Sequence, residues 1–450
     1  MRIVVTNYTG DRGNWGCQAT SRELLRFLQE TVPDRDASSI MTVPLPAPHA
    51  FDRHVESGYG GRLRRIYGDP RPSEEAISFV ETLTRERFGQ ACDDIAMADV
   101  VVFQGEGTVG PQSMFRSLRL FALPFLAVHR YRKPVLSMNQ SLYAADAGDA
   151  AVIRSLFGSF RMVALREATS YCFARSIGLD HAVLCPDFAF RQAPVPPTRP
   201  LVITGDYFCV SGSAASGAFD PKSLHRILHQ TVVEHGLRPV FLSSRAKDTR
   251  ELGALLGGLP GATIMSSTDL PDAAQLAGIL AGARFVIGGR YHTAIAALTQ
   301  GTPVLLFPGN THKNEGLAAM LDLKLQVFGT GDEAAIMERI EAIICGRGPG
   351  REYARTAVSG LGPICVEFGQ FVAATLREVC HGAGADISPP AEITPTYCDM
   401  GVRSPHGAVY QRANRRRGGS LPLLHRIALR HLRGRNGLEQ ELQRTFVELP

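Results

Sequence analysis

The chain has 450 residues, of which 44% are hydrophobic and 20% charged, with a formal net charge of +5. At roughly 100–200 residues per domain, this length predicts two or three domains. Their cores are large enough to be stable without disulfide bonds or bound metals. The composition excludes a disordered chain, and no apolar run approaches the ~20 residues of a membrane span. The N-terminus lacks the pattern of a secretion signal, so we expect a cytoplasmic protein.

The positive charge is unevenly distributed along the chain. Nine arginines and no acidic residue occur between Met400 and Leu438, so most of the basic excess lies in the C-terminal tail. The nine cysteines are dispersed, without the CxxC or CxH spacing of a zinc site. We therefore expect no metal.

The first part of the chain alternates short β-branched runs with helix-periodic segments, such as 21–29 and 168–177. The expected strands lie at 3–5, 100–103, 135–138, 162–165 and 183–185. This alternation is typical of parallel βαβ units. Between residues 34 and 72 the pattern weakens and Pro, Gly and Arg accumulate, which we interpret as a long surface excursion.

Four prolines between residues 191 and 200 forbid a continuous helix and predict a linker. The alternation then restarts, with strands expected at 201–204, 239–244, 262–265, 284–289 and 302–307. We predict an α/β fold of two Rossmann-like domains. Their expected bounds are 1–192 and 201–383, with a proline-rich linker at 193–200 and a basic extension at 384–450. Ligands of such folds bind beyond the carboxyl ends of the strands, and we expect the domains to face a central cleft.

A glycine-rich turn, with the sequence NYTGDRGNWG, follows the first expected strand. Its backbone N–H groups and the following helix N-terminus could accept an anion or an acceptor group. An ordinary strand-to-helix turn explains the same sequence equally well. The candidate residues are Gly10, Asp11, Gly13, Asn14 and Gly16.

A second turn, Gly105–Glu106–Gly107, follows the strand that ends at Phe103. The two glycines permit close approach of a ligand to the backbone, and Glu106 is a candidate acid or base. A solvated loop carboxylate is the commoner role for such a residue.

Two further polar residues follow strands. Arg166 could present its guanidinium to a carboxylate or phosphate, or could pair with Glu167. Asp187 could orient a substrate hydroxyl or cap a turn.

The most informative segment is RFVIGGRYHTAIAAL. A buried strand runs into Gly289 and is followed at once by Arg290 and His292, before a helix of small residues. Arginine supplies a fixed positive charge, and histidine can transfer protons near neutral pH. Lys313, after the next strand, adds another cation. Arginine and histidine together at this location favour a functional site over a structural role.

In this order, the motifs resemble those of the polysaccharide pyruvyl transferase family, over about residues 1–325. The matching blocks are the N-terminal glycine-rich turn, Asp99–Gly107, Ala164–Ser170, Pro186–Phe190, Arg290–His292 and Lys313. The resemblance implies a fold like that of GT-B glycosyltransferases. It also implies transfer of pyruvate from phosphoenolpyruvate to a sugar as a ketal, with release of phosphate and without a cofactor.

The resemblance places Arg166, Arg290 and His292 at the family's phosphoenolpyruvate-binding and catalytic positions. His292 is the candidate general acid that protonates the enol ether carbon. The candidate donor-binding residues are Arg166, Arg290, Lys313 and Gly289, which would stabilise the phosphate as it leaves.

The hydroxyl protons of the acceptor could pass to Glu106, Asp11 or Asp187, and the sequence does not choose among them. Three departures from the family pattern leave the acceptor open: Tyr291 replaces the usual Leu, Thr293 stands where Gly is common, and Glu106 interrupts a run normally all glycine. A polysaccharide repeat, a lipid-linked oligosaccharide and a small natural product all fit.

Two other functions fit parts of the sequence. A glycosyltransferase of the same fold would use Arg290 and Lys313 to grip the diphosphate of a nucleotide sugar, although no acidic residue stands at a clear ribose-binding position. A non-enzymatic module, active through its tail, is disfavoured by the intact Arg166, Arg290 and His292.

The basic tail carries a short amphipathic pattern at 423–432. Such a segment suits peripheral contact with an anionic membrane surface if the acceptor is lipid-linked. It suits a helix packed on the protein itself, or on a homo-oligomer partner, equally well. Because a single aromatic residue, Tyr410, stands among the arginines and no nucleic-acid-binding motif is present, we expect no nucleic-acid partner.

Overall fold

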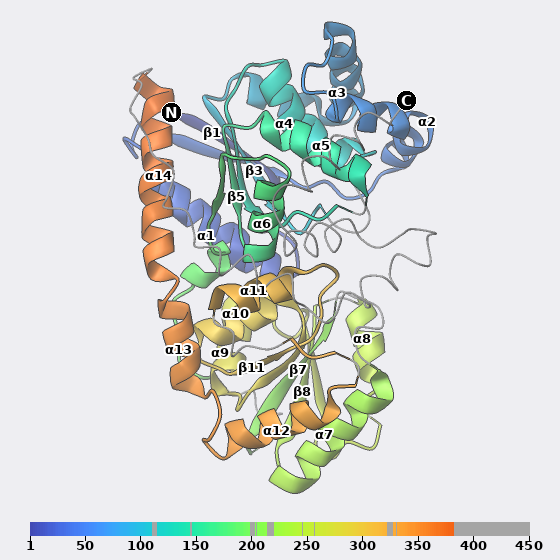
Figure 1. The fold of residues 1–450 in the computed structure, drawn as a ribbon, viewed down its shortest axis with the longest axis vertical. Helices are drawn as coiled ribbons and strands as arrows, with labels where there is room; N and C mark the ends of the chain where they lie inside the picture. Colours follow the sequence, from blue (N-terminus) through green and yellow to red (C-terminus); the bar gives the residue numbers. More distant parts are fainter. Residues whose placement is uncertain are drawn as a thin grey trace. The chain divides into compact units, whose positions relative to one another are not determined.

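The computed structural model describes residues 1–109, 115–144, 146–198, 203, 205–213, 220–244, 246–255, 257–321, 327–329 and 331–381. These residues form two α/β units, each built on a parallel sheet (Figure 1). Unit 1 contains Met1–Thr9, Leu25–Pro186 and the segment that begins at Ile364. Unit 2 contains Gly10–Leu24 and Asp187–Pro363.

Unit 1 has a six-stranded parallel sheet in the order β2-β1-β3-β4-β5-β6. The strands are β1 (Arg2–Tyr8), β2 (Ser39–Pro44), β3 (Val100–Glu106), β4 (Val135–Gln140), β5 (Met162–Leu165) and β6 (Ala182–Leu184). Every residue of β3 and β4 is buried. Near-continuous apolar runs are typical of parallel strands that are covered on both faces, so these two strands form the centre of the unit.

The helices of unit 1 lie between these strands in the chain, except for the last, which follows unit 2. They are α2 (Ala50–Tyr67), α3 (Glu74–Ala96), α4 (Leu118–His129), α5 (Ala147–Gly158), α6 (Ala168–Ser176) and α14 (Gly362–His381). Helix α1 (Trp15–Thr31) is divided, because its residues up to Leu24 group with unit 2 and the rest with unit 1.

Unit 2 has a five-stranded parallel sheet in the order β11-β10-β7-β8-β9. The strands are β7 (Tyr207–Ser213), β8 (Arg238–Ser243), β9 (Thr263–Ser266), β10 (Val286–Gly289) and β11 (Val304–Leu306). The helices are α7 (Pro221–His235), α8 (Ala246–Gly253), α9 (Ala273–Gly282), α10 (Tyr291–Thr299), α11 (Lys313–Leu321), α12 (Glu333–Ile344), α13 (Arg351–Ser359) and the short 3₁₀ helix η1 (Phe188–Arg191).

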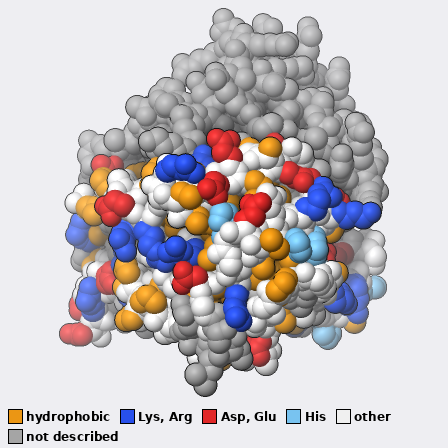
Figure 2. All heavy atoms as spheres, turned by 90° about the horizontal axis from the view of Figure 1, so that it is seen from below, with side chains coloured by type: hydrophobic (Ala, Val, Ile, Leu, Met, Phe, Trp, Pro, Cys, Tyr) orange, Lys and Arg blue, Asp and Glu red, His pale blue; other side chains and the backbone are white. Residues whose placement is uncertain are grey.

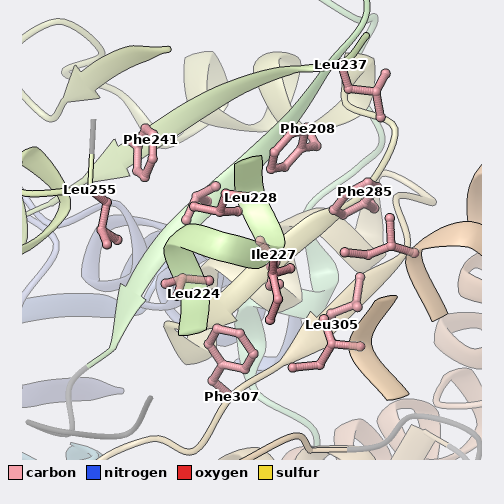
Figure 3. Close-up of a cluster of buried hydrophobic side chains, with 14 of the residues drawn as sticks. Phe208, Leu224, Ile227, Leu228, Leu237, Phe241, Leu255, Phe285, Leu305 and Phe307 are labelled. Carbon is pink, nitrogen blue, oxygen red and sulfur yellow. The ribbon is translucent and has the colours of Figure 1, made fainter. Parts of the chain in front are cut away.

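Helix α7 shows how local sequence and burial combine in unit 2. Asp220 caps its N-terminus by accepting from the N–H of Ser223, Pro221 fills the first turn, and Gly236 ends the helix at a positive φ of 64°. One face of α7 packs on the sheet, where its apolar side chains meet those of β7, β8 and the strands beyond (Figure 3). Phe208 and Phe285 stack there with ring centroids 4.9 Å apart.

The strands expected from the sequence of unit 1 coincide with or overlap β1 and β3 to β6. The surface excursion expected at 34–72 is wrong, because this region forms β2 and α2. The pattern is weak there because β2 is a half-buried edge strand and α2 contains three glycines, which lower helix propensity. A capping box between His49 and Asp52 starts the helix nevertheless.

In unit 2, four of the five expected strands coincide with β8, β9, β10 and β11. Most of the strand expected at 201–204 lies outside the described residues, as does the basic extension at 384–450. The first described strand of this sheet is β7, at Tyr207–Ser213.

The contacts divide the chain differently from the contiguous domains that the sequence suggested. Residues 10–24 belong to unit 2, and the chain returns to unit 1 at Ile364. The contacts of α14 explain why the chain returns to unit 1. Phe368 stacks on Phe27 with ring centroids 5.7 Å apart, and Glu378 accepts a hydrogen bond from Arg161 at 2.5 Å. Local periodicity cannot show which sheet a terminal helix packs on.

One stretch among the described residues, Arg351–Cys380, is long and apolar enough by composition to cross a membrane. A single such stretch is weak evidence for a span. Its α14 part buries Phe368, Val372 and Leu376, as a helix packed on a core does.

Basic, acidic and hydrophobic side chains are interspersed on the face of the molecule that Figure 2 shows. Surface ion pairs of this kind include Arg226 of α7 with Glu333 of α12, at 2.7 Å. Such exposed pairs contribute little to stability. The stability of unit 2 therefore rests on its apolar core.

We expect Phe285→Ala to lower the free energy of unfolding by about 3–5 kcal/mol, because it leaves a cavity beside Phe208. Urea denaturation followed by circular dichroism measures the change. The control is Val233→Ala on the exposed side of α7, which should change stability by less than about 0.5 kcal/mol. Equal effects of the two substitutions would contradict this account of the core.

Candidate active site

The carboxyl end of β10 in unit 2 is held in a close-packed environment. A Cβ atom added to Gly288, whose φ is 151°, would lie 2.2 Å from the backbone oxygen of Ser211 on β7. A Cβ on Gly289 would lie 2.6 Å from Oγ of Ser213. Asn314 then ties two strand ends together, since its Nδ2 donates to the carbonyls of Gly289 at 3.2 Å and Phe307 at 2.7 Å. The residues that follow Gly289 therefore leave the sheet from a fixed point.

His292, in the first turn of α10, is oriented by a buried carboxylate. Its Nε2 lies 3.2 Å from Oδ2 of Asp187, which is fully buried. The other oxygen, Oδ1, accepts from Oγ1 of Thr20 at 2.7 Å and from the N–H of Ala189 at 2.9 Å. An ionised carboxylate only accepts hydrogen bonds, so Nε2 carries the hydrogen of this contact. The other ring nitrogen, Nδ1, makes no hydrogen bond with Asp187.

The small size of Gly16 makes room for the other side of this ring. A Cβ on Gly16 would lie 2.3 Å from Nδ1 of His292, closer than any real contact of that kind. The first turn of α1 is fixed there because Asn14 caps it, its Oδ1 accepting from the N–H groups of Gly16 at 3.0 Å and Cys17 at 3.2 Å.

Two further side chains hold the start of α1 against unit 2. Nε1 of Trp15 donates to the carbonyl of Leu270 at 2.5 Å, and Gln18 donates to Pro271 and accepts from Ala273, both at 3.0 Å. The glycine-rich turn thus serves the structure of unit 2 directly. Its capped N–H groups at residues 16 and 17 are already used by Asn14, whereas Asp11 and Gly13 are exposed and Gly10 is buried.

Arg290 precedes α10 and is paired with a buried aspartate. Its Nη2 donates to Oδ1 of Asp248, and Ser244 donates to the other oxygen at 3.4 Å. Asp248 is 1% exposed, whereas the Arg290 side chain is 14% exposed. Nε of Arg290 is buried and has no hydrogen-bond partner among the residues that the structure describes. The guanidinium is therefore fixed in place, and its buried Nε donor is unused among the described residues.

A second cation follows the neighbouring strand β11. Nζ of Lys313 donates to Oδ1 of Asn310 at 2.6 Å and lies 6.0 Å from the ring centroid of Tyr291. Its exposure is intermediate. Because β10 and β11 are adjacent and parallel, Lys313 and Arg290 follow the same edge of the sheet.

The remaining candidates lie in unit 1, at the carboxyl ends of its strands. Arg166 follows β5 and is almost fully buried, with its Nε donating to Oγ of Ser141 at 2.9 Å. Glu106 ends β3, and its Oε1 accepts from Oγ1 of Thr9 and from Nε2 of Gln104, the latter at 2.8 Å.

The two glycines beside Glu106 differ in their surroundings. A Cβ on Gly105 would lie 1.8 Å from Oε1 of Gln140, so this position requires glycine. Gly107 is half-buried in the turn that follows β3.

Unit 2 thus brings together His292, Asp187 and Gly16, and places Arg290, Gly289 and Lys313 along one sheet edge. Sequence reasoning missed Thr20, Asp248 and Asn314 as partners of these residues. Asp248 stands only a few residues after β8, so the rule of strand carboxyl ends could have indicated it. Thr20 lies inside a helix, where no local signal distinguishes it.

Comparison with known proteins can now be set beside this geometry. The family model for polysaccharide pyruvyl transferase matches residues 14–310, more than half of the chain. The chain belongs to the polysaccharide pyruvyl transferase family. It is therefore a transferase, and the resemblance seen in its sequence motifs is confirmed. No curated protein matches it significantly.

Solved structures with a similar fold are distant in sequence. A Listeria monocytogenes protein described as a UDP-N-acetylglucosamine 2-epimerase has 12% identity and a TM-score of 0.55, covering 87% of this chain and 99% of its own. The S. aureus MnaA–UDP structure has 12% identity and a TM-score of 0.54, covering 87% and 100%. These similarities confirm the expected α/β fold with two Rossmann-like domains of the GT-B type.

We expect Asp187→Asn to release the His292 ring from its fixed tautomer, because an amide can donate as well as accept. Long-range ¹H–¹⁵N NMR correlations of ring-labelled histidine measure the tautomer directly. The control is Asp272→Asn, which removes an exposed partner of Arg22 and should leave the His292 signals unchanged. Unchanged His292 signals in Asp187→Asn would contradict the proposed orientation of the ring.

Proposed function

We propose that this pyruvyl transferase moves the enolpyruvyl-derived group of phosphoenolpyruvate onto two hydroxyls of a sugar as a cyclic ketal, releasing phosphate. The observation that carries the proposal is the carboxyl end of β10. There, a fixed arginine with an unused donor and a histidine oriented by a buried aspartate follow the same strand within three residues. The arginine can bind the trianionic phosphoenolpyruvate, and the histidine can protonate its methylene carbon.

Arg290 binds the phosphate or carboxylate of the donor through the guanidinium edge that Asp248 does not occupy. Lys313 adds positive charge along the same strand edge, and both cations stabilise the phosphate as negative charge develops on it. Arg166 contributes through a buried guanidinium in unit 1, where Ser141 fixes its orientation.

His292 acts in its doubly protonated form, in which Nε2–H stays on Asp187 while Nδ1 delivers its proton to the methylene carbon of phosphoenolpyruvate, which becomes a methyl group. The adjacent carbon becomes electrophilic, and a sugar hydroxyl attacks it. The bond between this carbon and the phosphate oxygen then breaks, and a second hydroxyl closes the ring. Of the two hydroxyl protons, one replaces the proton that His292 gave and the other leaves with phosphate.

Three carboxylates were candidates for accepting the hydroxyl proton, and their surroundings support a different role for each. Asp187 is fully buried and accepts from His292, Thr20 and Ala189, so we assign it the positioning of the imidazole. Asp11 is exposed. Glu106 ends a buried strand and is oriented by two donors, and we propose it as the general base.

We expect His292→Ala to reduce ketal formation by about 10²-fold or more, because general acid catalysis is lost. The assay measures phosphate release from phosphoenolpyruvate with a panel of glycans, and mass spectrometry detects the gain of pyruvate. The control is His229→Ala, an exposed histidine of α7 that should keep full activity. Full activity of His292→Ala would remove it as the acid.

Thermal-shift measurements on the wild-type protein distinguish a pyruvyl transferase from a nucleotide-sugar glycosyltransferase. Phosphoenolpyruvate should raise the melting temperature of the wild-type protein. A shift with UDP-glucose but none with phosphoenolpyruvate would favour a nucleotide-sugar glycosyltransferase, in line with the UDP of the S. aureus structure.

Asp248→Asn tests how Arg290 is held. We expect the KM for phosphoenolpyruvate to rise about tenfold with a smaller change in kcat, because a charge-assisted hydrogen bond that fixes the guanidinium is lost. Steady-state kinetics measure both constants. Asp206→Asn, which alters an exposed pair with Arg284, serves as the control and should leave the KM unchanged. An unchanged or lower KM in Asp248→Asn would contradict this role.

A further inference from the structure

A second set of polar side chains gathers at the carboxyl ends of β1, β3 and β4, which are neighbours in the sheet of unit 1. The set consists of Asn7, Gln104, Glu106 and Gln140, each at least nine-tenths buried. Glu106 and Gln140 are paired in the strand register, and Asn7 contacts the backbone of Gln104. These residues therefore form one group on one sheet edge.

The amide groups of Asn7 and Gln140 have a defined orientation. Nδ2 of Asn7 donates to the carbonyl of Gln104 at 2.5 Å, and Nε2 of Gln140 donates to the carbonyls of Glu106, at 3.3 Å, and Ser141. A carbonyl can only accept, so these contacts fix which end of each amide is the nitrogen.

The amide oxygens are consequently left over. Oδ1 of Asn7 and Oε1 of Gln140 are both buried, and neither has a hydrogen-bond partner in the part of the chain that the structure describes. Leaving a buried acceptor without a hydrogen bond costs free energy, and native proteins rarely do so. Two such atoms on one sheet edge, together with Glu106, are acceptors that a group from outside the chain could satisfy.

The group is rich in acceptors. Beside the two amide oxygens it holds the carboxylate of Glu106, whose Oε1 already accepts from Thr9 and Gln104. This is the opposite of the β10 edge in unit 2, where the unused group is the donor Nε of Arg290. These oxygens repel an anion, whereas a hydroxyl group can donate to them. The neighbouring cation, Arg166, directs its Nε to Ser141.

The local backbone agrees with a site rather than with an ordinary turn. Asn7, Glu106 and Asn139 have positive φ angles of 62°, 49° and 58°, so three adjacent strands end in a left-handed conformation without glycine. Asparagine adopts this conformation readily, but it is strained for Glu106, and such strain clusters at functional sites. Glu106 is also the residue that interrupts a run of glycines in the family pattern.

We propose that this edge of unit 1 binds the acceptor sugar, with the amide oxygens of Asn7 and Gln140 receiving hydroxyl protons beside Glu106. The inference rests on the proposed function and adds the acceptor class to it. The sugar ring bound here is a neutral polyhydroxylated hexopyranoside. A uronate is rejected, since its carboxylate would face the Glu106 carboxylate and two amide oxygens.

Ligand-observed NMR on the full chain, without phosphoenolpyruvate, tests the proposal. The probes are the methyl glycosides of glucose, galactose and mannose. Each is compared with the methyl glycoside of the corresponding uronic acid, which carries a free carboxylate. We expect saturable binding of at least one neutral glycoside and at least tenfold weaker binding of its uronate. Binding of no neutral glycoside, or equal or tighter binding of the uronate through the nearby Arg166, would overturn the proposal.

The informative variant is Asn7→Gly, because glycine adopts a φ of 62° without strain while removing the amide oxygen. We expect at least tenfold weaker glycoside binding and an unchanged thermal shift with phosphoenolpyruvate. The matched control is Arg132→Gly, which replaces an exposed residue at a φ of 54° elsewhere in unit 1 and should bind as the wild type does. Wild-type glycoside binding by Asn7→Gly would contradict the assignment.

A second variant covers the case in which Asn7→Gly does not fold. Glu106→Gln keeps the side-chain shape but turns one acceptor into a donor, and it should weaken glycoside binding as well. Unchanged binding in this variant would count against the site. Phosphoenolpyruvate binding without glycoside binding would refute only this inference, whereas glycoside binding without phosphoenolpyruvate binding would refute only the proposed donor.

Discussion

The hydrogen bond between His292 and Asp187 is the contact on which the architecture of unit 2 converges. It joins the start of α10, the turn before η1 and, through Thr20, the first half of α1. A buried carboxylate without hydrogen bonds costs free energy, so its pairing favours the folded arrangement of these segments. Gly16 is part of the same constraint, because any larger residue would displace the imidazole. The groups that fold the unit are thus the groups that orient its catalytic candidate.

The two units carry complementary chemistry at the same topological position, the carboxyl ends of parallel strands. In unit 2, cations and an unused guanidinium donor suit a phosphorylated, carboxylated donor substrate. In unit 1, unused amide oxygens and a carboxylate suit a hydroxylated acceptor. The proposed ketal formation requires such a division, between an anionic donor and a neutral polyol. The proposed mechanism gives Glu106 and Asp187 distinct roles that the sequence alone left undivided.

Much of this organisation could be predicted from the sequence, because parallel strands are local apolar runs and their carboxyl ends hold the polar residues that follow them. The candidates Arg290, His292 and Glu106 come from that rule. The partners Asp248 and Thr20 were not, because a pairing between distant segments leaves no periodic signal. The same limit explains α14, whose apolar face is evident from the sequence although the sheet it packs on is not.

Proton delivery to the methylene carbon of phosphoenolpyruvate is the central chemical claim, and a solvent isotope experiment tests it most directly. The reaction is run in D₂O with the glycan that gives phosphate release, and the product is examined by NMR and mass spectrometry. Protonation from a solvent-exchanged imidazole predicts one deuterium in the methyl group of the ketal. A product without deuterium in that methyl group, or one that retains the methylene as an enol ether, would contradict the account.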